Sequence, residues 1–200
     1  LYVTQQDGLI KIYDITQPVP GQWSAVEAET LSLIQSIPNH NDDGSLNTSI
    51  TDRQVTGVLV TGTADNPVIY VTSSDPRIGN FGDLNLDTNS GILSQLTWNG
   101  SSWSKVDLIR GLPRSEENHS PNGMVLSADG TKLYVTVGSN SNVGEEGIEN
   151  ERNRAAILAA LAVSAIPAVV QAQSTTYNAE VRRTSFGIAH VKAADYDALL

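Results

Sequence analysis

Eight short stretches of the chain alternate apolar, β-branched or aromatic residues with polar ones, and the stretches occur in pairs. Each pair encloses a short turn that contains Asn-Gly, Asp-Gly or Asn-Pro, residues that favour tight reversals of the chain. This period of two, bounded by turn residues, predicts antiparallel β-hairpins. The four predicted hairpins have strands at 1–4 and 9–15, 55–61 and 68–74, 91–98 and 103–109, and 123–127 and 132–138.

A short motif recurs along this series of strands. LYVT at residue 1, IYVT at residue 69 and LYVT at residue 133 are spaced 68 and 64 residues apart. Each is followed by a segment that begins near a small residue, namely GLIKIYDI, GILSQLTW and RAAILAAL. After the first two copies comes a further predicted strand that ends in proline, at 31–38 and at 106–113.

The repeat indicates the fold class. Four strands and a long polar loop in each repeat are typical of a β-propeller blade. A β-sandwich is the alternative, although its strands would not repeat such a motif. We therefore expect an all-β fold in residues 1–152, a partial propeller of about two to three blades. Such an incomplete arc exposes strand edges and apolar faces, so we expect it to fold poorly alone.

Charge changes at the same place as composition. Residues 1–152 hold 8 basic and 19 acidic side chains, whereas residues 153–200 hold 4 and 3. The formal net charge of −10 argues against a nucleic-acid partner, which would require a basic surface. The chain has no cysteine, which excludes disulfides, thiolate metal sites and thiol nucleophiles.

Residues 153–172 are predicted as an apolar, alanine-rich helix similar to a secretory signal peptide. Arg152 and Arg154 precede eighteen uncharged residues, and the run ends in small residues at 170 and 172. A positive start, an apolar middle and a small-x-small end are typical of export signals. Pro167 makes the run marginal for a membrane span, and a buried helix is the alternative. We expect a secreted or periplasmic protein with no stable membrane span.

One histidine is the candidate for chemistry in the first part of the chain. His119 lies in the loop ENHSPNG, directly before the predicted strand at 123–127. In the blade pattern this loop leads into an innermost strand, beside the central channel. A histidine titrates near neutral pH and can serve as a general base, here next to Asn118. The alternative is a surface histidine that bonds the backbone.

Residues 1 to about 158 resemble the N-terminal half of the soluble quinoprotein glucose/sorbosone dehydrogenase family. The resemblance lies in LYVTQQDGLIKIYDI, in RQVTGVLV and above all in GLPRSEENHSPNGMVLSADGTKLYVTVGSNSN. It implies a six-bladed propeller that oxidises a small-molecule sugar with bound pyrroloquinoline quinone, assisted by calcium. The family's cofactor-clamping basic residues and its calcium loop would lie beyond this fragment.

The resemblance assigns roles to five residues. His119 matches the catalytic base, which takes the proton from the sugar hydroxyl during hydride transfer, and Gln54 matches a glutamine that lines the sugar and cofactor site. Asn118 stands where the family often has an aspartate, and Ser139, beside Asn140, replaces another. With Gln54, these three residues are the ones that the resemblance implies for cofactor and substrate binding. Since these exchanges remove negative charge, a non-catalytic carbohydrate- or ligand-binding propeller module is the alternative to an oxidoreductase.

Residues 173–200 resemble the mature N-terminus of the penicillin acylase family of N-terminal-nucleophile hydrolases. The residues alone predict strands at EVRRT and IAHVKA, then a short helix from Ala194. The resemblance implies the first piece of an amide hydrolase whose catalytic serine lies further along. The matching positions are Arg182, Gly187, His190, Asp195 and Leu199, while Ala189 replaces a common proline.

Two partial families therefore meet near Ile157–Ala160. A signal peptide inside a chain suggests a join of two gene fragments, by fusion or by an assembly error. One divergent protein with an alanine-rich membrane anchor is the alternative. In either case each candidate site is incomplete, so we expect the chain to be inactive by itself; its oligomeric state is left open.

Two further features have a structural and a functional interpretation. Asn39, Asn41 and Asp43 have the offsets that open a calcium loop, but Ile50 replaces its final glutamate and excludes an EF-hand. Two interpretations of this loop remain, a weakly bound cation and a solvated turn. The tryptophans at 98 and 103 flank the NGSS turn, where we expect cross-strand packing and not a sugar platform.

Overall fold

The described part of the chain is built from β-strands and turns, and it contains no helix. No helix among these residues is therefore long and apolar enough to cross a membrane. The chain divides into two compact units, Leu1–Ala162 and Val163–Leu200. The all-β expectation for the first unit is confirmed. The computed structural model describes residues 1–41, 43–77, 89–114, 120–138, 156–161, 179–183 and 189–193.

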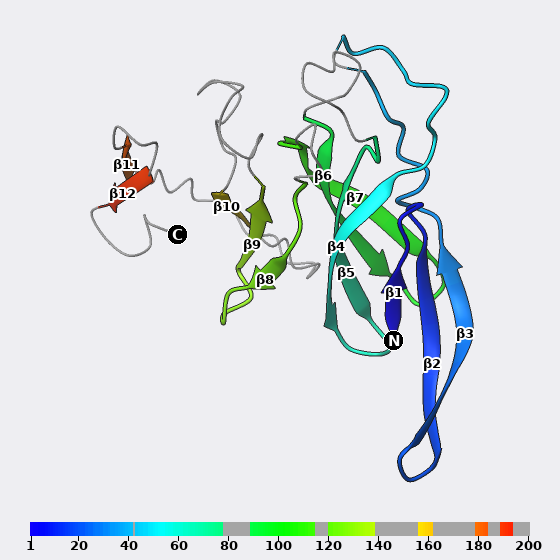
Figure 1. Ribbon diagram of the computed structural model, residues 1–200. Helices are drawn as coiled ribbons and strands as arrows, with labels where there is room; N and C mark the ends of the chain where they lie inside the picture. The colour runs from blue at the N-terminus through cyan, green and yellow to red at the C-terminus, as the bar shows by residue number, and fades with distance from the viewer. Residues whose placement is uncertain are drawn as a thin grey trace. The chain divides into compact units, whose positions relative to one another are not determined.

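The first unit contains three antiparallel sheets whose strands follow the order of the chain (Figure 1). The first sheet consists of β1 (Tyr2–Thr4), β2 (Ile10–Val19) and β3 (Gln22–Leu31). The second consists of β4 (Gln54–Gly62), β5 (Pro67–Ser74), β6 (Gly91–Trp98) and β7 (Trp103–Leu112). The third consists of β8 (Met124–Leu126), β9 (Lys132–Val137) and β10 (Ala156–Leu161).

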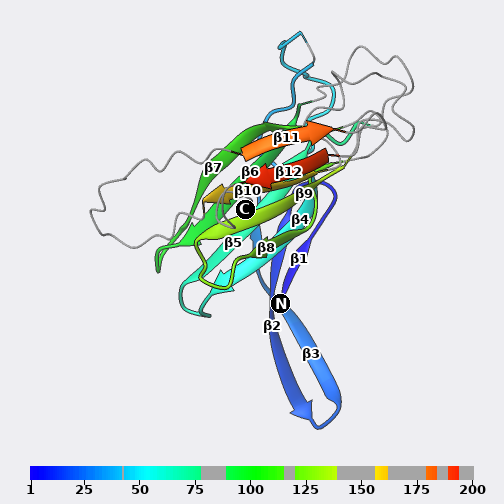
Figure 2. The same cartoon turned by 90° about the vertical axis from the view of Figure 1, so that its left-hand side faces the viewer.

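The four predicted hairpins are confirmed as the antiparallel pairs β1–β2, β4–β5, β6–β7 and β8–β9. The repeated motif falls on equivalent strands, because β1, β5 and β9 each pair with the strand that follows them. The long β2–β3 hairpin projects beyond the rest of its sheet (Figure 2). Its far part is exposed, and Trp23 is 70% exposed.

The prediction of a strand over 31–38 is wrong, because this segment folds into turns. The amide of Ser36 donates to the carbonyl of Ser32 at 3.1 Å. Its apolar residues Leu31, Ile34 and Ile37 are three apart, and all three are buried in one cluster. A spacing of three suits a helical turn better than a strand. The strand that completes the first sheet is instead β3, which precedes this segment.

Two apolar clusters join the three sheets through the two faces of the second sheet. The first cluster brings Ile10 and Leu31 of the first sheet against Ile69, Val71 and other residues of the second. The second cluster brings Tyr70, Leu93 and Leu112 of the second sheet against Leu133 and Val135 of the third. Alternate residues of β5 therefore serve different cores, as the period of two in a strand requires.

The apolar helix expected over 153–172 is not what the described residues of that segment form. Ala156–Leu161 is a strand, and it pairs along its whole length with β9. Alanine and leucine favour helices, but an uninterrupted apolar run has no period that separates a helix from a buried strand. Pairing with β9, and the packing of Leu158 on the second cluster, accounts for the strand. The remainder of 153–172 lies outside the described residues.

The second unit contains a two-stranded antiparallel sheet. Its strands are β11 (Ala179–Arg183) and β12 (Ala189–Ala193), and Arg182 pairs with His190. Both strands predicted in this segment are therefore confirmed. The predicted helix from Ala194 lies outside the described residues.

Candidate functional site

Gln54 lies at the end of the second sheet where β5 and β7 terminate. It is the first residue of β4 and pairs with Ser74, the last residue of β5. The hydroxyls of Ser74 and Ser120 are 3.1 Å apart and share a hydrogen bond. Gln54 is half-buried at this point. Ser74, the register partner of Gln54, thus contacts the residue that follows His119 in the sequence.

The segment from Ser120 to Asn122 is fixed on the second sheet by threonine hydroxyls. Thr56 of β4 donates to the carbonyl of Pro121, and Thr72 of β5 donates to the carbonyl of Asn122 at 3.1 Å. The amide of Asn122 donates to the carbonyl of Thr136 in the third sheet at 2.9 Å. This segment therefore links the second and third sheets at the end where Gln54 lies.

Gly57 permits this close approach of the two backbones. A Cβ atom at this position would lie 2.1 Å from the carbonyl oxygen of Asn122 and 2.7 Å from the Thr72 hydroxyl. Neither separation is compatible with a side chain, so the glycine in the RQVTG motif has a steric role. It keeps the segment after His119 against β4.

The other predicted site residues lie outside the described residues. Asn118 and His119 directly precede Ser120. Ser139 and Asn140 come after β9, with one residue between the strand and Ser139. Because Asn122 bonds Thr136, the end of β9 lies at the same end of the sheets as the segment after His119. The described structure thus links the strand end beside Gln54 to Ser120, and the roles of all five residues stay predictions.

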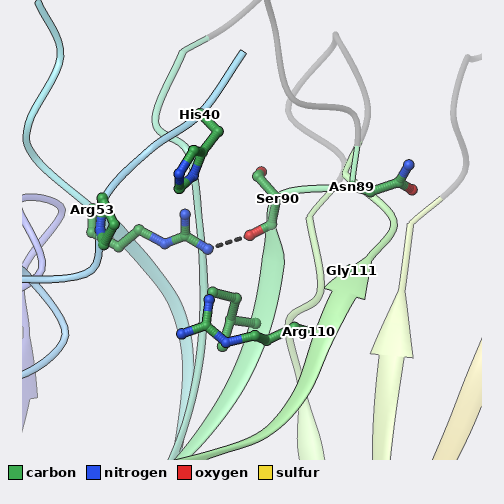
Figure 3. Close-up of a pocket in the computed structure, with 8 residues that line it drawn as sticks. His40, Arg53, Asn89, Ser90, Arg110 and Gly111 are labelled. Carbon is green, nitrogen blue, oxygen red and sulfur yellow. Dashed lines mark hydrogen bonds between the residues drawn. The ribbon is translucent and has the colours of Figure 1, made fainter. Parts of the chain in front are cut away.

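Arg53, which sequence analysis did not single out, is the centre of a buried polar network beside Gln54. Its side chain is 2% exposed. One terminal nitrogen donates to Asn39 Oδ1 at 3.1 Å, and the other donates to the carbonyls of Ser73 and Ser90. Figure 3 shows the bond to Ser90. Hydrogen bonds from a charged donor are stronger than those between neutral groups. Arg53 therefore ties the loop before β4 to β5 and to the entry of β6.

A pocket of about 200 Å³ adjoins Arg53. In Figure 3 the guanidinium of Arg53 lies between the ring of His40 and the side chain of Arg110. The volume is below the roughly 300–1,000 Å³ of typical small-molecule pockets. It suits a few water molecules and not a sugar together with a cofactor. The lining residues are Pro38, His40, Arg53, Asn89, Ser90, Ile92, Arg110 and Gly111.

The oxygen atoms of the loop considered for calcium accept hydrogen bonds from protein groups. Asn39 Oδ1 accepts from Arg53, and Asn41 Oδ1 accepts from Arg77 at 2.8 Å. Asp43 Oδ1 accepts from the amide of Ser45 at 2.9 Å. Two arginine side chains thus occupy oxygens that a loop cation would require, which favours the structural turn.

Arg77 also pairs with the buried carboxylate of Asp75 through both of its oxygens. The Nε atom lies 3.0 Å from Oδ1 and 2.9 Å from Oδ2. The backbone amide of Asp75 donates a hydrogen bond to Ser90 Oγ at 3.1 Å. Burial of a carboxylate is costly unless it is paired, and this pair meets that requirement. The segment after β5 is thereby joined to the loop at 39–47.

Trp98 and Trp103 confirm the expected cross-strand packing. They are register partners across β6 and β7, and their ring centroids are 5.6 Å apart with an interplanar angle of 50°. The indole nitrogen of Trp103 donates to Glu29 of the first sheet at 3.1 Å. The two rings thus pack on each other in a tilted arrangement, which favours the packing role over a sugar platform.

Comparisons of the chain with protein-family models, with curated proteins and with solved structures find no match. The functional assignment therefore depends on the residues and contacts of this chain.

Proposed function

We propose that this chain is part of a sugar-binding β-propeller of the quinoprotein glucose/sorbosone dehydrogenase type. Each of the three sheets would be one blade, complete in the second sheet and partial in the others. Supporting this, the repeated motif occupies equivalent strands and consecutive sheets pack face to face. Propeller blades are related in the same way.

One observation carries the functional part of the proposal. The hydrogen bond between Ser74 and Ser120 links the strand end beside Gln54 to the residue that follows His119. Two motifs far apart in sequence therefore meet at one end of the sheets. An amide and two hydroxyls are suited to the hydroxyl groups of a sugar, and an imidazole one residue away would accept a hydroxyl proton.

The described residues around Gln54 fit a sugar better than they fit the quinone. Pyrroloquinoline quinone is a tricarboxylate, so its site requires positive charge. Gln54, Ser74 and Ser120 are neutral, and the guanidinium of Arg53 donates hydrogen bonds to Asn39, Ser73 and Ser90. We therefore assign sugar binding, and not quinone binding, to these groups.

Calorimetry of the full chain with glucose and other aldoses tests the sugar site. We expect weak aldose binding that Gln54→Ala and His119→Ala each reduce by about tenfold, the loss of roughly 1.4 kcal/mol, or one good hydrogen bond. Gln22→Ala, at an exposed position of β3, is the matched control and should bind as the parent does. Unchanged binding in Gln54→Ala would contradict the assignment.

A ligand-binding module without redox chemistry is the second candidate. Asn118 favours it, because a neutral amide does not raise the basicity of the neighbouring imidazole as a carboxylate would. Titration with the quinone separates the two candidates, since aldose binding without quinone binding favours the module. Quinone-dependent dye reduction by the 200-residue chain would contradict our expectation that it is inactive by itself.

A further inference from the structure

The three sheets of the first unit place equivalent residues on the face that is directed toward the next sheet. The threonine of each repeated motif pairs with a large aliphatic residue on the neighbouring strand. The aliphatic partner therefore occupies an equivalent position in each of the three sheets. The three pairs are Thr4 with Ile10, Thr72 with Leu93, and Thr136 with Ile157.

The exposure of this position differs sharply in the last sheet. Ile10 is 0% exposed because the second sheet covers it, and Leu93 is 0% exposed because the third sheet covers it. Ile157 is 70% exposed. The same position in the repeat is thus a core residue twice and a surface residue once.

A residue near Ile157 shows the same difference, since it is exposed where its equivalent in the second sheet is packed. Val125 of β8 pairs with Tyr134 of β9, as Leu59 pairs with Tyr70 in the second sheet. Leu59 and Tyr70 pack in the second cluster, whereas Val125 is exposed. Val125, Tyr134 and Ile157 form what we name the outer face of the third sheet. Within the described part of the chain, no third apolar cluster covers it.

The first sheet carries the matching surface at the opposite end of the stack. The motif valines Val71 and Val135 are fully buried, and each faces the preceding sheet. Their equivalent, Val3, is exposed, as is Leu1 on the same side of β1. In the first two sheets the positions equivalent to Ile157 lie in clusters that contain Val71 or Val135 of the next sheet. The exposed side of the first sheet carries the equivalent valine, Val3.

We propose that copies of this chain associate head to tail through these two faces. The outer face of the third sheet of one copy packs on Leu1 and Val3 of a second copy. The ion pair of Lys11 with Glu27, 2.8 Å long, borders Val3 and forms part of a polar rim. Since the two faces differ, the contact is heterologous and gives a closed ring or an open filament.

Light scattering of the full chain after size-exclusion chromatography tests this association. We expect a mass of at least twice the 21.3 kDa of one chain. Ile157→Lys and Val3→Glu should each reduce it to a single chain. An equimolar mixture of the two variants should restore association into pairs, because the unaltered outer face of Val3→Glu can pack on the unaltered Leu1 and Val3 of Ile157→Lys. Val106→Lys, at a comparably exposed valine of β7, is the control that should not dissociate.

Two results would overturn the proposal. One is a parent chain that has the mass of a single copy at every concentration. The other is dissociation by Ile157→Lys with no effect of Val3→Glu, which would indicate that two third sheets meet each other. Neither result bears on the sugar site, because the aldose titration does not use these faces.

Cross-linking keeps the test decisive if a charged variant fails to fold. The chain has no cysteine, so Val3→Cys and Ile157→Cys each introduce a single thiol. Mild oxidation of the mixture should give disulfide-linked heterodimers in several-fold excess over the pair made with Val106→Cys. Equal yields for the two mixtures would contradict a head-to-tail contact.

Discussion

Gly57 illustrates how one residue positions a whole segment. Substitution by alanine would place Cβ 2.1 Å from the Asn122 carbonyl oxygen, a backbone atom that no rotamer change can move. We expect Gly57→Ala to lower the free energy of unfolding by about 1–3 kcal/mol, the usual cost of an overpacked site. Urea denaturation of the full chain measures this change.

Gly123→Ala is the matched control for that substitution. Its Cβ would lie 3.5 Å from the Thr136 hydroxyl, an ordinary contact. We expect its free energy of unfolding to stay within about 0.5 kcal/mol of that of the parent, the usual range for surface substitutions. Equal losses in the two variants would show that the close approach of Asn122 to β4 is not the cause.

Asp129 closes the turn between β8 and β9 and should titrate unusually low. The Ser127 hydroxyl donates to its carboxylate, as do the amide and hydroxyl of Thr131, and these bonds lower its pKa from 3.8 to about 2. Since the folded-state pKa is depressed, the stabilisation is complete above pH 3.8 and is lost as the pH falls through 2.

The side-chain carbon shift of Asp129, followed by NMR from neutral to acid pH, checks this expectation. Ser127→Ala removes the strongest donor and should move the midpoint back toward the ordinary value. A midpoint near 3.8 in the parent would contradict the hydrogen bonding of the turn.

The sequence suggests a role for Gln54 but none for the buried Arg53 beside it, and the difference has a physical cause. The role expected of Gln54 rests on a family resemblance in the RQVTG motif. The role of Arg53 depends on Asn39, Ser73 and Ser90, which only the folded chain brings together. An arginine directly before a predicted strand carries no sign in the sequence that it is buried.

At the scale of elements, strands with alternating patterns and tight turns were predictable, and those without were not. The strand β3, QWSAVEAETL, is exposed over most of its length and lacks a clear apolar alternation. It forms because it pairs with β2. The segment Ala156–Leu161 is uniformly apolar, so only its pairing with β9 distinguishes a strand from the expected helix.

The Trp98–Trp103 pair should contribute to the stability of the β6–β7 hairpin. We expect a double-mutant cycle with Trp98→Leu and Trp103→Leu to give a coupling of about 0.5–1.5 kcal/mol, typical of tilted aromatic pairs. Trp103→Leu alone should cost more than Trp98→Leu, because it also removes the bond to Glu29. Thermal or urea unfolding provides the four free energies.

The exposed Trp23 offers the control for this cycle. Because it lies on the projecting β2–β3 hairpin, Trp23→Leu should be additive with Trp98→Leu. Additivity in the Trp98–Trp103 cycle as well, within about 0.3–0.5 kcal/mol, would mean that the two rings do not support each other.

At the scale of the whole molecule, the net charge of −10 opposes the compact state. We expect the unfolding temperature at pH 7 to rise when salt increases from about 0.01 M to about 0.15 M, since the screening length falls from roughly 30 Å to 8 Å. Calorimetry at both concentrations measures the shift.

The same salt titration near pH 4.6, the isoelectric point, is the control. There the repulsion is nearly balanced, so the rise should disappear. A fall in unfolding temperature with salt at pH 7 would indicate that surface ion pairs such as Lys11–Glu27 outweigh the general repulsion.

The sheets of the first unit make their apolar clusters with neighbours in sequence, the first with the second and the second with the third. This arrangement has a consequence for synthesis on the ribosome. The buried residues of the first cluster have all been translated once β6 is complete, and Trp103 of β7, which packs on them, follows soon after, so the first core can form before the third sheet has been translated. The nascent chain would then gain its structure one sheet at a time, and each new sheet would cover the apolar face left by the previous one.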